Sequence, residues 1–521
     1  MSNRKLAKNA GSMSLAVFIS RILGLIRDIM MTGFFGTSAV ADAFRVAFQI
    51  PNFLRRLFGE GALSAAFVPI YTEMGVNKSR EFQIKFALNV LSLLTAFLVI
   101  LCIMGILLAP ILVKVIAPGL DAETQQLTVK LTRILFPYLF LIGLSSTLIS
   151  ILNSHDIFFI PGLSSAFLNL GMIGCLGFFV LINDTSTMQE KVFVWSFGVL
   201  IGGILQTIIN FPLLKKLGYS LKLNLRRQNE ALKDVWQRLI PGAIGIAVRQ
   251  INLIADMILA SLLVTGSIAA LGYGNRLMQL PMGIFGIAAG VAVLPLFSRY
   301  VAKQDWQGLY DSLKFSVVSL SFIMLPVTAI IAGLGKDLIR LLFMRGQFNL
   351  HSLEMTYSAL LFYSLGIFFY SMNRLIIPVF YANKDTKTPV KVSAVIVLIN
   401  IILNIIFMQF LEHAGLALAT SVSAAVQFIM LKDLMRKKIG LIHFPKVGKE
   451  IWKLFFISLI IYAVLFVANY FLIASNVLEL IVKLILLSII SLVIMLVGSD
   501  LLNVRYSKQI KARIKRKLLK K

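Results

Sequence analysis

The chain has 521 residues, of which 58% are hydrophobic and 14% are charged, and its formal net charge is +28. Soluble proteins are about 45–50% apolar and about 25% charged, so this composition excludes the soluble globular class. The positive charge would suggest a nucleic-acid partner for a soluble protein. In a membrane protein it is typical of basic cytoplasmic loops, so we expect no nucleic-acid partner.

Long apolar segments dominate the sequence, and a helix that crosses a bilayer needs about 20 mostly apolar residues. Fourteen segments meet this description. In chain order they are 11–35, 39–74, 84–117, 125–153, 157–182, 190–214, 236–264, 267–300, 308–334, 352–381, 389–411, 414–435, 449–473 and 478–502. The sequence therefore predicts an all-α polytopic membrane protein with 14 transmembrane helices.

Basic residues mark alternate connections between these segments. An even number of spans places both termini on one side, and the connections on that side are basic, as at 78–85, 215–238 and 432–453. The opposite connections carry few basic residues, so we expect both termini in the cytoplasm. The basic tail, 504–521, is interpreted as part of this topology signal, and contact with anionic membrane lipids is the alternative.

The first twelve spans contain an internal repeat. Arg21 and Asp28 match Arg249 and Asp256, and other matches keep one order at an offset of roughly 226–231 residues, which is typical of transporter repeats. The predicted domains are an N-lobe, a C-lobe, a pair of extra helices and a basic tail, with bounds 1–216, 217–438, 439–503 and 504–521. Six spans per lobe make the repeats parallel, and this plan predicts a substrate site between them.

Ionisable residues occur inside the predicted spans, where each costs at least ~2.5–3.5 kcal/mol at the helix centre. Arg21 and Asp28 share one stripe of the first span, with Arg27 beside it. Span 8 carries Arg276 near Pro281. The second span has a polar face made of Asp42, Arg45, Gln49, Asn52 and Arg56, with Arg55 and Glu60 at its border and a kink expected at Pro51.

Arginines outnumber carboxylates in this set of buried charges. Internal pairing, such as Arg21 with Asp28 or Arg55 with Glu60, would neutralise some of them but not all. The guanidinium group stays charged and its planar fork matches phosphate oxygens. The sequence therefore predicts a cationic cavity for a substrate that carries a phosphate or diphosphate.

A second polar set lies in later spans and consists of Asp256, Asn400, Asn404 and Thr420. One carboxylate with amide and hydroxyl oxygens suits Na⁺, or Asp256 could carry a proton. The equally weighted alternative is that Asp256 pairs with Arg249 while the asparagines bond between helices. The four histidines are dispersed and no metal-protease or phosphate-binding loop motif is present, so we expect no enzyme activity.

Several stretches of the sequence resemble the MurJ (MviN) family of the multidrug/oligosaccharidyl-lipid/polysaccharide exporter superfamily. They are SRILGLIRD from Ser20, ADAFRVAF from Ala41, PNFLRRLFGEGALSAAFVP from Pro51, GNRLMQLP from Gly274 and DTKTPVK from Asp385. The resemblance covers essentially the whole chain, and the motif in the first two spans is specific.

The resemblance implies a bacterial inner-membrane flippase that moves lipid II, an undecaprenyl-diphosphate-linked peptidoglycan precursor, to the periplasmic leaflet by alternating access. It implies a groove for the lipid tail at 439–503. From the charges we expect coupling to Na⁺, H⁺ or the membrane potential, and no bound cofactor. The family's essential charges match Arg21, Arg27, Asp42, Arg55, Glu60 and Arg276, and its sodium-type site falls on Asp256, Asn400, Asn404 and Thr420. Asn275, Gln279 and Asn404 stand where some members have acids.

Other functions remain open from the sequence. A flippase for another polyprenyl-diphosphate-linked glycan, of the O-antigen or teichoic-acid type, fits the same cavity. A cationic-drug exporter is disfavoured by the positive charge, and a glycosyltransferase lacks a sizeable catalytic loop. A non-transporting scaffold that binds cell-wall synthesis proteins would not need arginines inside the membrane. A monomer suffices, because one chain contains both lobes.

Overall fold

The computed structural model describes residues 3–57, 62–183, 185–219, 250–439 and 447–509, together with Gln237 and Ala512. These residues form helices and turns, and no strand occurs among them. They divide into two compact units. The first unit is Met1–Gly266 with Arg345–Gln347, and the second is Ser267–Met344 with Phe348–Lys521.

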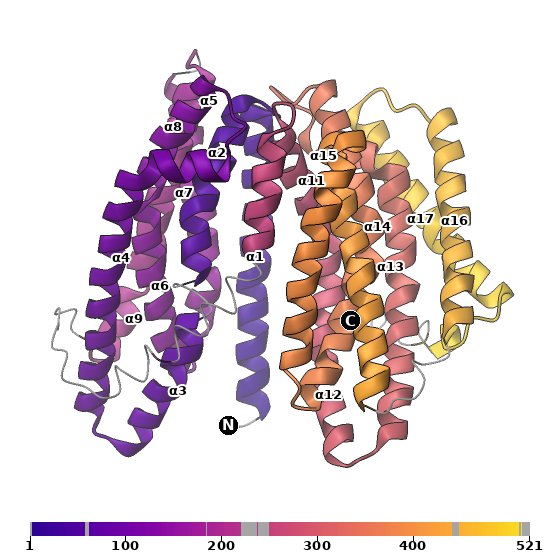
Figure 1. The fold of residues 1–521 in the computed structure, drawn as a ribbon, viewed down its shortest axis with the longest axis horizontal. Coiled ribbons are helices and arrows are strands. Elements are labelled where there is room, and N and C mark those ends of the chain that lie inside the picture. Colours follow the sequence, from indigo (N-terminus) through magenta and orange to yellow (C-terminus); the bar gives the residue numbers. More distant parts are fainter. Residues whose placement is uncertain are drawn as a thin grey trace. The chain divides into compact units, whose positions relative to one another are not determined.

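The first unit is a helical bundle, coloured from indigo to magenta in Figure 1. Within it, α7 packs against α1 and α8, α6 packs against α4 and α8, and α2 packs against α5. Its helices are α1 (Asn3–Phe35), α2 (Ala39–Arg55), α3 (Ala62–Asn77), α4 (Arg80–Ile116), α5 (Ala122–Leu135), α6 (Pro137–Ser154), α7 (Phe159–Ile182), α8 (Met188–Ile208), α9 (Phe211–Lys216) and the unlabelled helix Gln250–Ser261.

Polar capping residues lie at the start of several of these helices, in the connections between apolar segments. The Ser38 side chain accepts a hydrogen bond from the N–H of Ala41 at the start of α2. Thr187 and Glu190 form a reciprocal capping box at the start of α8. Such caps satisfy backbone N–H groups that have no partner inside the helix, so they fix where each helix begins.

Glycines allow α7 and α8 to approach closely. A Cβ atom at Gly202 would lie 2.7 Å from Cα of Leu168, and one at Gly198 would lie 2.8 Å from Cα of Met172. Small residues at helix contacts are typical of membrane proteins, because lipid supplies no hydrophobic force between helices and close packing must replace it.

The second unit contains the later helices of the chain. In it, α14 packs against α11, α12, α13 and α15, while α16 and α17, drawn in yellow in Figure 1, pack against α13. Its helices are α11 (Ser267–Pro281), the π-helical segment η2 (Met282–Gly286), α12 (Ile287–Ala302), α13 (Trp306–Phe343), α14 (Leu350–Ala382), α15 (Lys387–Ile439), α16 (Gly448–Phe471) and α17 (Val477–Leu501).

The helix α15 contains two of the predicted spans. Its backbone is non-helical at Glu412, where φ is 49° and ψ is −131°. This kink falls in the short gap between the predicted segments 389–411 and 414–435. The chain therefore turns without leaving enough residues to separate two helices.

The second predicted span of each lobe is interrupted. The helix α2 runs through Pro51, and a π-helical turn begins at Arg56 rather than at the proline. In the second unit, Pro281 ends α11 and the π-helical segment η2 follows before α12. The matching interruptions support the predicted sequence repeat, which stays a prediction.

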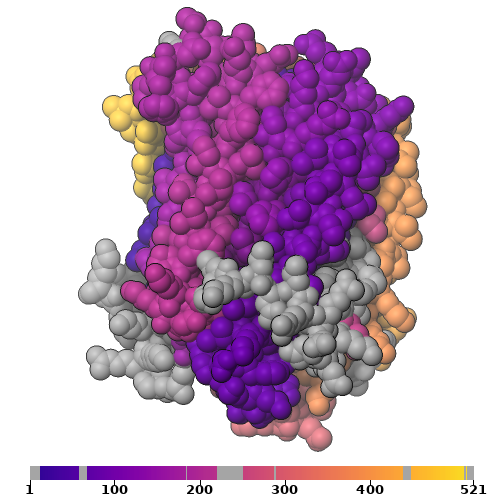
Figure 2. All heavy atoms as spheres, turned by 90° about the vertical axis from the view of Figure 1, so that its left-hand side faces the viewer, coloured from indigo at the N-terminus to yellow at the C-terminus, as the bar shows by residue number. Residues whose placement is uncertain are grey.

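Apolar surface covers the described helices. Ten helical segments among the described residues are long and apolar enough to cross a membrane. One of these ten segments, α15, contains two predicted spans, so the ten account for eleven of the predicted spans. The other three predicted spans correspond to α1, to α2 with α3, and to Gln250–Ser261, which is consistent with 14 spans. On the face shown in Figure 2, α4 forms part of the purple surface. Its exposed residues include Ile100, Ile103, Leu107 and Ile111 at helical spacing.

The boundary of the first unit lies at Gly266, whereas the predicted N-lobe ends at residue 216. Two hydrogen bonds join residues near Gly266 to the rest of the first unit. The N–H of Gly119 donates to Oγ of Ser261 at 3.2 Å, and the N–H of Gly266 donates to Asp42 at 2.6 Å. The compact unit therefore extends past the predicted repeat boundary, and the repeat-based domains stay a prediction.

Candidate functional site

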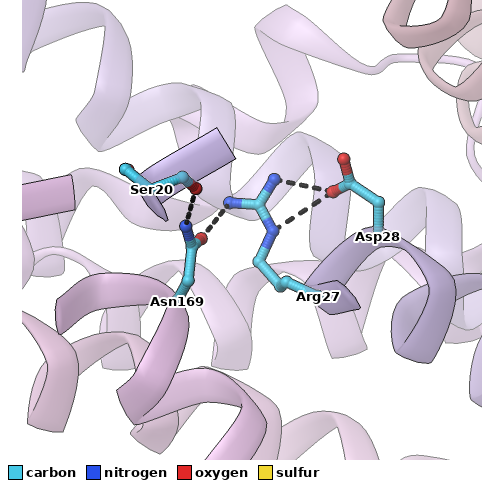
Figure 3. A network of polar contacts seen from close by, with 4 residues as sticks. All are labelled: Ser20, Arg27, Asp28 and Asn169. Atoms are coloured by element: carbon cyan, nitrogen blue, oxygen red, sulfur yellow. Dashed lines mark hydrogen bonds and ion pairs between the residues drawn. The ribbon is translucent and has the colours of Figure 1, made fainter. Parts of the chain in front are cut away.

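Arg27 is held at the centre of a polar network between α1 and α7 (Figure 3). Its Nη2 and Nε donate to Oδ1 of Asp28 at 2.6 and 3.2 Å, and its Nη1 donates to Oδ1 of Asn169 at 3.1 Å. The Asn169 amide in turn donates to the backbone carbonyl of Ser20 at 3.2 Å. Asn169 on α7 therefore orients an arginine on α1.

This network leaves part of the guanidinium group available. Arginine has five N–H donors, and three of them serve the bonds to Asp28 and Asn169. The Arg27 side chain keeps 21% of its surface exposed, while Asn169 is 5% exposed. A fixed guanidinium with free donors is suited to bind an anion, because its orientation is set before the anion arrives.

The structure corrects the pairing that the spacing suggested for α1. Arg21 and Asp28 lie seven residues apart, which favours one stripe, but Asp28 pairs with Arg27. Arg21 is exposed and does not belong to this network. The reason is the length of the Arg27 side chain and its bond to Asn169, which directs the guanidinium towards the neighbouring carboxylate.

The polar face of α2 is also present. Arg55 donates to Oδ1 of Asn52 at 2.6 Å, and Arg56 donates to Oε1 of Gln250 at 3.2 Å. Arg45, Arg55 and Arg56 are half-buried. The first unit thus contains several half-buried arginines on α2 and the turn that follows it.

Asp42 lies at the start of α2 and is buried, with 3% exposure. Its Oδ2 accepts the hydrogen bond from the N–H of Gly266. A cavity of about 30 Å³ adjoins it and is also lined by Asp121, Thr124 and Ser261. Asp42 therefore ties Gly266, which follows the Gln250–Ser261 helix in the chain, to the start of α2.

Other predicted residues fall outside this cluster. Glu60 and Arg249 lie outside the described residues. Arg276 lies on α11 in the second unit and is exposed. One helical turn later, the Gln279 amide donates to Oδ1 of the Asn275 side chain, and neither of these two neutral neighbours brings a negative charge to Arg276.

Arg374 is an intramembrane arginine that sequence reasoning missed. It lies in α14 and is exposed, and its backbone lies against Gly290, where a Cβ atom would be 2.8 Å from the Arg374 carbonyl oxygen. The neighbouring Asn373 is buried and donates to the carbonyl oxygen of Ala424 on α15 at 3.0 Å. The sequence signal that could have identified Arg374 is a single arginine in a long apolar segment.

The predicted cation-type set is divided between the units. Asp256 lies in the first unit and accepts a hydrogen bond from Asn252 at 3.3 Å. In the second unit, Asn400 donates to Oγ of Ser423 at 3.2 Å, and Asn404 donates to Oδ1 of Asn400 at 3.1 Å. Thr420 donates to the carbonyl of Leu416. These bonds favour the alternative in which the asparagines join helices, and the cation site stays a prediction.

A second polar cluster connects the ends of α3, α4, α6 and α9 in the first unit. The Tyr71 hydroxyl lies 2.8 Å from Nε2 of His155 and also contacts the Tyr219 hydroxyl. Arg80 donates to Nε2 of His155 at 3.2 Å and to the carbonyl of Leu217 at 3.0 Å. Burial lowers the pKa of His155, and the Arg80 charge lowers it further. The geometry therefore requires a neutral imidazole.

Comparison with known proteins agrees with these features. The family model of the lipid II flippase MurJ matches residues 31–491. The chain is 32% identical over 461 residues to the lipid II flippase MurJ of Burkholderia cenocepacia, covering 85% of each chain. It is 32% identical over 471 residues to a protein of Buchnera aphidicola subsp. Baizongia pistaciae named "Probable lipid II flippase MurJ", covering 90% of this chain and 91% of the relative.

Solved structures show the same similarity. The fold matches a lipid II flippase MurJ in the inward closed conformation with a TM-score of 0.78 at 29% identity, covering 96% of this chain and 99% of that one. An inward-facing multidrug resistance MATE family transporter of the MOP superfamily matches with a TM-score of 0.63 at 14% identity, covering 81% of this chain and 96% of that one. The second match shows a shared fold alone.

Proposed function

The chain belongs to the lipid II flippase MurJ family, and we propose that it moves lipid II from the cytoplasmic to the periplasmic leaflet. It is a multi-pass membrane transporter and not an enzyme. The observation that carries the proposed mechanism is Arg27, which is oriented by Asp28 and Asn169 and retains free donors. A diphosphate is the part of lipid II that such a group recognises.

Arg27 and Arg55 are the proposed diphosphate ligands of the first unit. Both have a guanidinium positioned by a neighbouring amide oxygen, from Asn169 and Asn52 respectively. Charge-assisted hydrogen bonds of this kind contribute about 1.5–3 kcal/mol each. Arg276 is the proposed ligand from the second unit, and its exposure on α11 supports that role.

The remaining charges of the first two spans have proposed conformational roles. Asp42 accepts a hydrogen bond from the N–H of Gly266, so a conformational change that moves Gly266 away from α2 has to break this bond. Arg21 and Glu60 complete the charge pattern of the family motif. We propose that these three residues shape the cavity or exchange partners during alternating access, in which the head group crosses while the lipid tail stays in the bilayer.

The pair α16 and α17 is the proposed surface for the lipid tail. Both helices expose large apolar side chains, among them Phe456, Ile460, Phe466, Ile485 and Ile489. A long isoprenoid chain needs no polar partner, so an apolar surface at membrane depth suffices for it. This surface corresponds to the segment 439–503 that the family resemblance assigns to the tail.

The energy source is proposed from charge. One elementary charge that crosses 100 mV gains about 2.3 kcal/mol, so a carrier with excess positive charge can respond to the membrane potential. Coupling to Na⁺ or H⁺ through Asp256, Asn400, Asn404 and Thr420 is the second proposal. Ionophores that collapse the potential or one cation gradient, applied separately to proteoliposomes, distinguish the two.

The proposed location is the bacterial inner membrane, with both termini in the cytoplasm. The basic connections and the basic tail support this orientation. The basic segment 504–521 either serves as a plain topology signal or contacts anionic membrane lipids. A monomer suffices for transport. Cell-wall synthesis proteins are proposed as further partners.

A reconstituted assay tests the function directly. The purified chain in vesicles should move fluorescent lipid II between leaflets, whereas polyprenyl-diphosphate carriers of O-antigen or teichoic-acid type should move more slowly. Faster transport of one of those carriers would replace lipid II as the substrate but keep the diphosphate mechanism. Absence of all transport with normally folded protein would contradict the proposal.

A further inference from the structure

Polar contacts join α13 to the end of the α16–α17 hairpin where α16 passes into α17. On α16, the Asn469 amide donates to the carbonyl of Gly333 at 2.6 Å. In the connection, the carbonyl of Ala474 accepts from Arg340 at 3.1 Å. The α13 residues Gly333 and Arg340 are seven apart and share one side of that helix.

Between these two contacts lies an ion pair inside the membrane-spanning helices. Nζ of Lys483 on α17 is 2.7 Å from Oδ2 of Asp337 on α13. Only 9% of the Lys483 side chain and 15% of the Asp337 side chain are exposed. Lys483 follows the first residue of α17, Val477, by six positions, which places it about 9 Å along the helix. Its backbone is therefore more than one turn inside α17, and its side chain is almost entirely shielded from solvent.

A second ion pair on α13 provides a comparison. Nζ of Lys336 lies 2.7 Å from Oε1 of Glu354, the same distance as in the Lys483–Asp337 pair. Its side chains are 50% and 58% exposed. Exposed pairs contribute little, whereas an ionisable residue within a membrane helix is costly and marks a function. The two pairs share geometry and differ in burial.

Stability alone does not explain the buried pair. Replacing a buried ion pair with apolar residues is often neutral or stabilising, because the charges lose their hydration. A buried polar group can instead select one register among several packings. This need is strong for α17, because its other buried residues, Leu480, Leu487, Ser491, Met495 and Ser499, are apolar or small. Lipid provides no hydrophobic force that would hold such a face in one position.

We propose that Lys483 and Asp337 are positioning residues that fix the α16–α17 hairpin in one register on α13 and so place its apolar surface for a long isoprenoid tail. This inference rests on the proposed function. Near the same end of α16, Phe466, Tyr470 and Phe471 are 65%, 79% and 73% exposed. These aromatic side chains move along the membrane with the hairpin, so a change of register displaces the surface that the tail contacts.

The first test compares substrates with long and short tails in the reconstituted assay. The variant Lys483→Met with Asp337→Leu removes both charges, and its thermal stability should stay near that of the wild type. Its transport of lipid II with a full-length tail should fall about tenfold relative to a short-tail analogue, as expected for a misplaced contact. The exchange Lys483→Asp with Asp337→Lys should restore the ratio, and Lys336→Met should leave it unchanged.

Two outcomes of this test overturn the inference. If both substrates slow equally and stability falls in parallel, the pair is structural. If neither transport rate changes, the register does not depend on the pair. Failure of the wild type to move either substrate contradicts the proposed function instead, and the register is then tested without transport.

The second test measures the register by crosslinking. A Cβ atom at Gly333 would lie 2.9 Å from Cβ of Leu465 on α16. In a background without Cys102 and Cys175, Gly333→Cys should crosslink with Leu465→Cys and not with cysteine at Ile461, one turn away. The charge-free double variant should crosslink at this neighbouring position too. An unchanged crosslinking pattern would contradict the inference, whatever the transport assay shows.

Discussion

The buried carboxylate of Asp42 accepts a hydrogen bond of 2.6 Å from the backbone N–H of Gly266, a residue more than two hundred positions later in the chain. Gly266 has φ of +93°, a conformation that glycine adopts without strain. A Cβ atom there would also collide with the carbonyl oxygen of Thr37. The bond therefore depends on a residue without a side chain.

Gly266→Ala should destabilise the protein by about 1–3 kcal/mol, because alanine is strained at this φ and the Asp42 bond is displaced. Thermal unfolding of the purified variant measures the loss. Gly174→Ala is the control, since no atom lies within 4 Å of a Cβ at that position. Equal melting temperatures for the two variants would show that the Asp42–Gly266 contact does not restrict the backbone.

Asn169→Leu should reduce lipid II transport about tenfold while leaving the number of charges unchanged. The substitution removes the amide oxygen that orients Arg27, so a further guanidinium donor loses its partner. Transport in vesicles, normalised to inserted protein, measures the effect. The exposed Asn183→Ala at the end of the same helix is the control. Wild-type transport by Asn169→Leu would show that Arg27 needs no orientation.

His155 should make stability depend on pH. Its pKa is lowered from 6.5 by burial and by Arg80, with Asp156 opposing, so the unfolded chain binds the proton more readily. The contribution of neutral His155 is therefore complete above about pH 6.5 and is lost as pH falls through the lowered pKa. Melting temperatures between pH 7.5 and 5 should fall more steeply, by roughly a few degrees, for the wild type than for His155→Gln. Parallel profiles would contradict this role.

Arg374→Gln should reduce transport with little effect on insertion, because an exposed arginine within a membrane helix is retained for function rather than for packing. A loss of about tenfold is expected if Arg374 contributes one charge-assisted contact to the anionic substrate. Arg374→Lys should recover part of the activity, since the charge remains but the planar fork does not. Full activity of the glutamine variant would exclude a substrate contact.

The helices were largely predictable because apolar length is a local property of the sequence. Each predicted span overlaps a helix among the described residues, and the split of α15 occurs at Glu412, inside the predicted gap. The excess of arginines in the first two spans could also be predicted from the sequence. The bond between Arg27 and Asn169 could not be predicted, because Asn169 lies on another helix and its position depends on packing.

The buried ion pair of the second unit was missed for a related reason. A single lysine in an otherwise apolar segment such as α17 is compatible with a side chain that extends to the membrane surface. Its partner Asp337 lies far away in the sequence, directly after Lys336, which pairs elsewhere. Only the packing of α17 on α13 distinguishes the two lysines. The contact between Gly266 and Asp42, in the first unit, likewise joins residues that are distant in the sequence.

The most direct test of the central claim measures lipid II at the outer face of living cells. Cells depleted of their own lipid II flippase would carry this chain, as wild type, Arg27→Ala or the control Lys85→Ala, which alters an exposed pair with Glu81. A periplasmic enzyme that cleaves lipid II reports how much has crossed. We expect cleavage with the wild type and the control, and a loss of about tenfold or more with Arg27→Ala at equal insertion. Equal cleavage in all three would contradict the proposal that Arg27 binds the diphosphate.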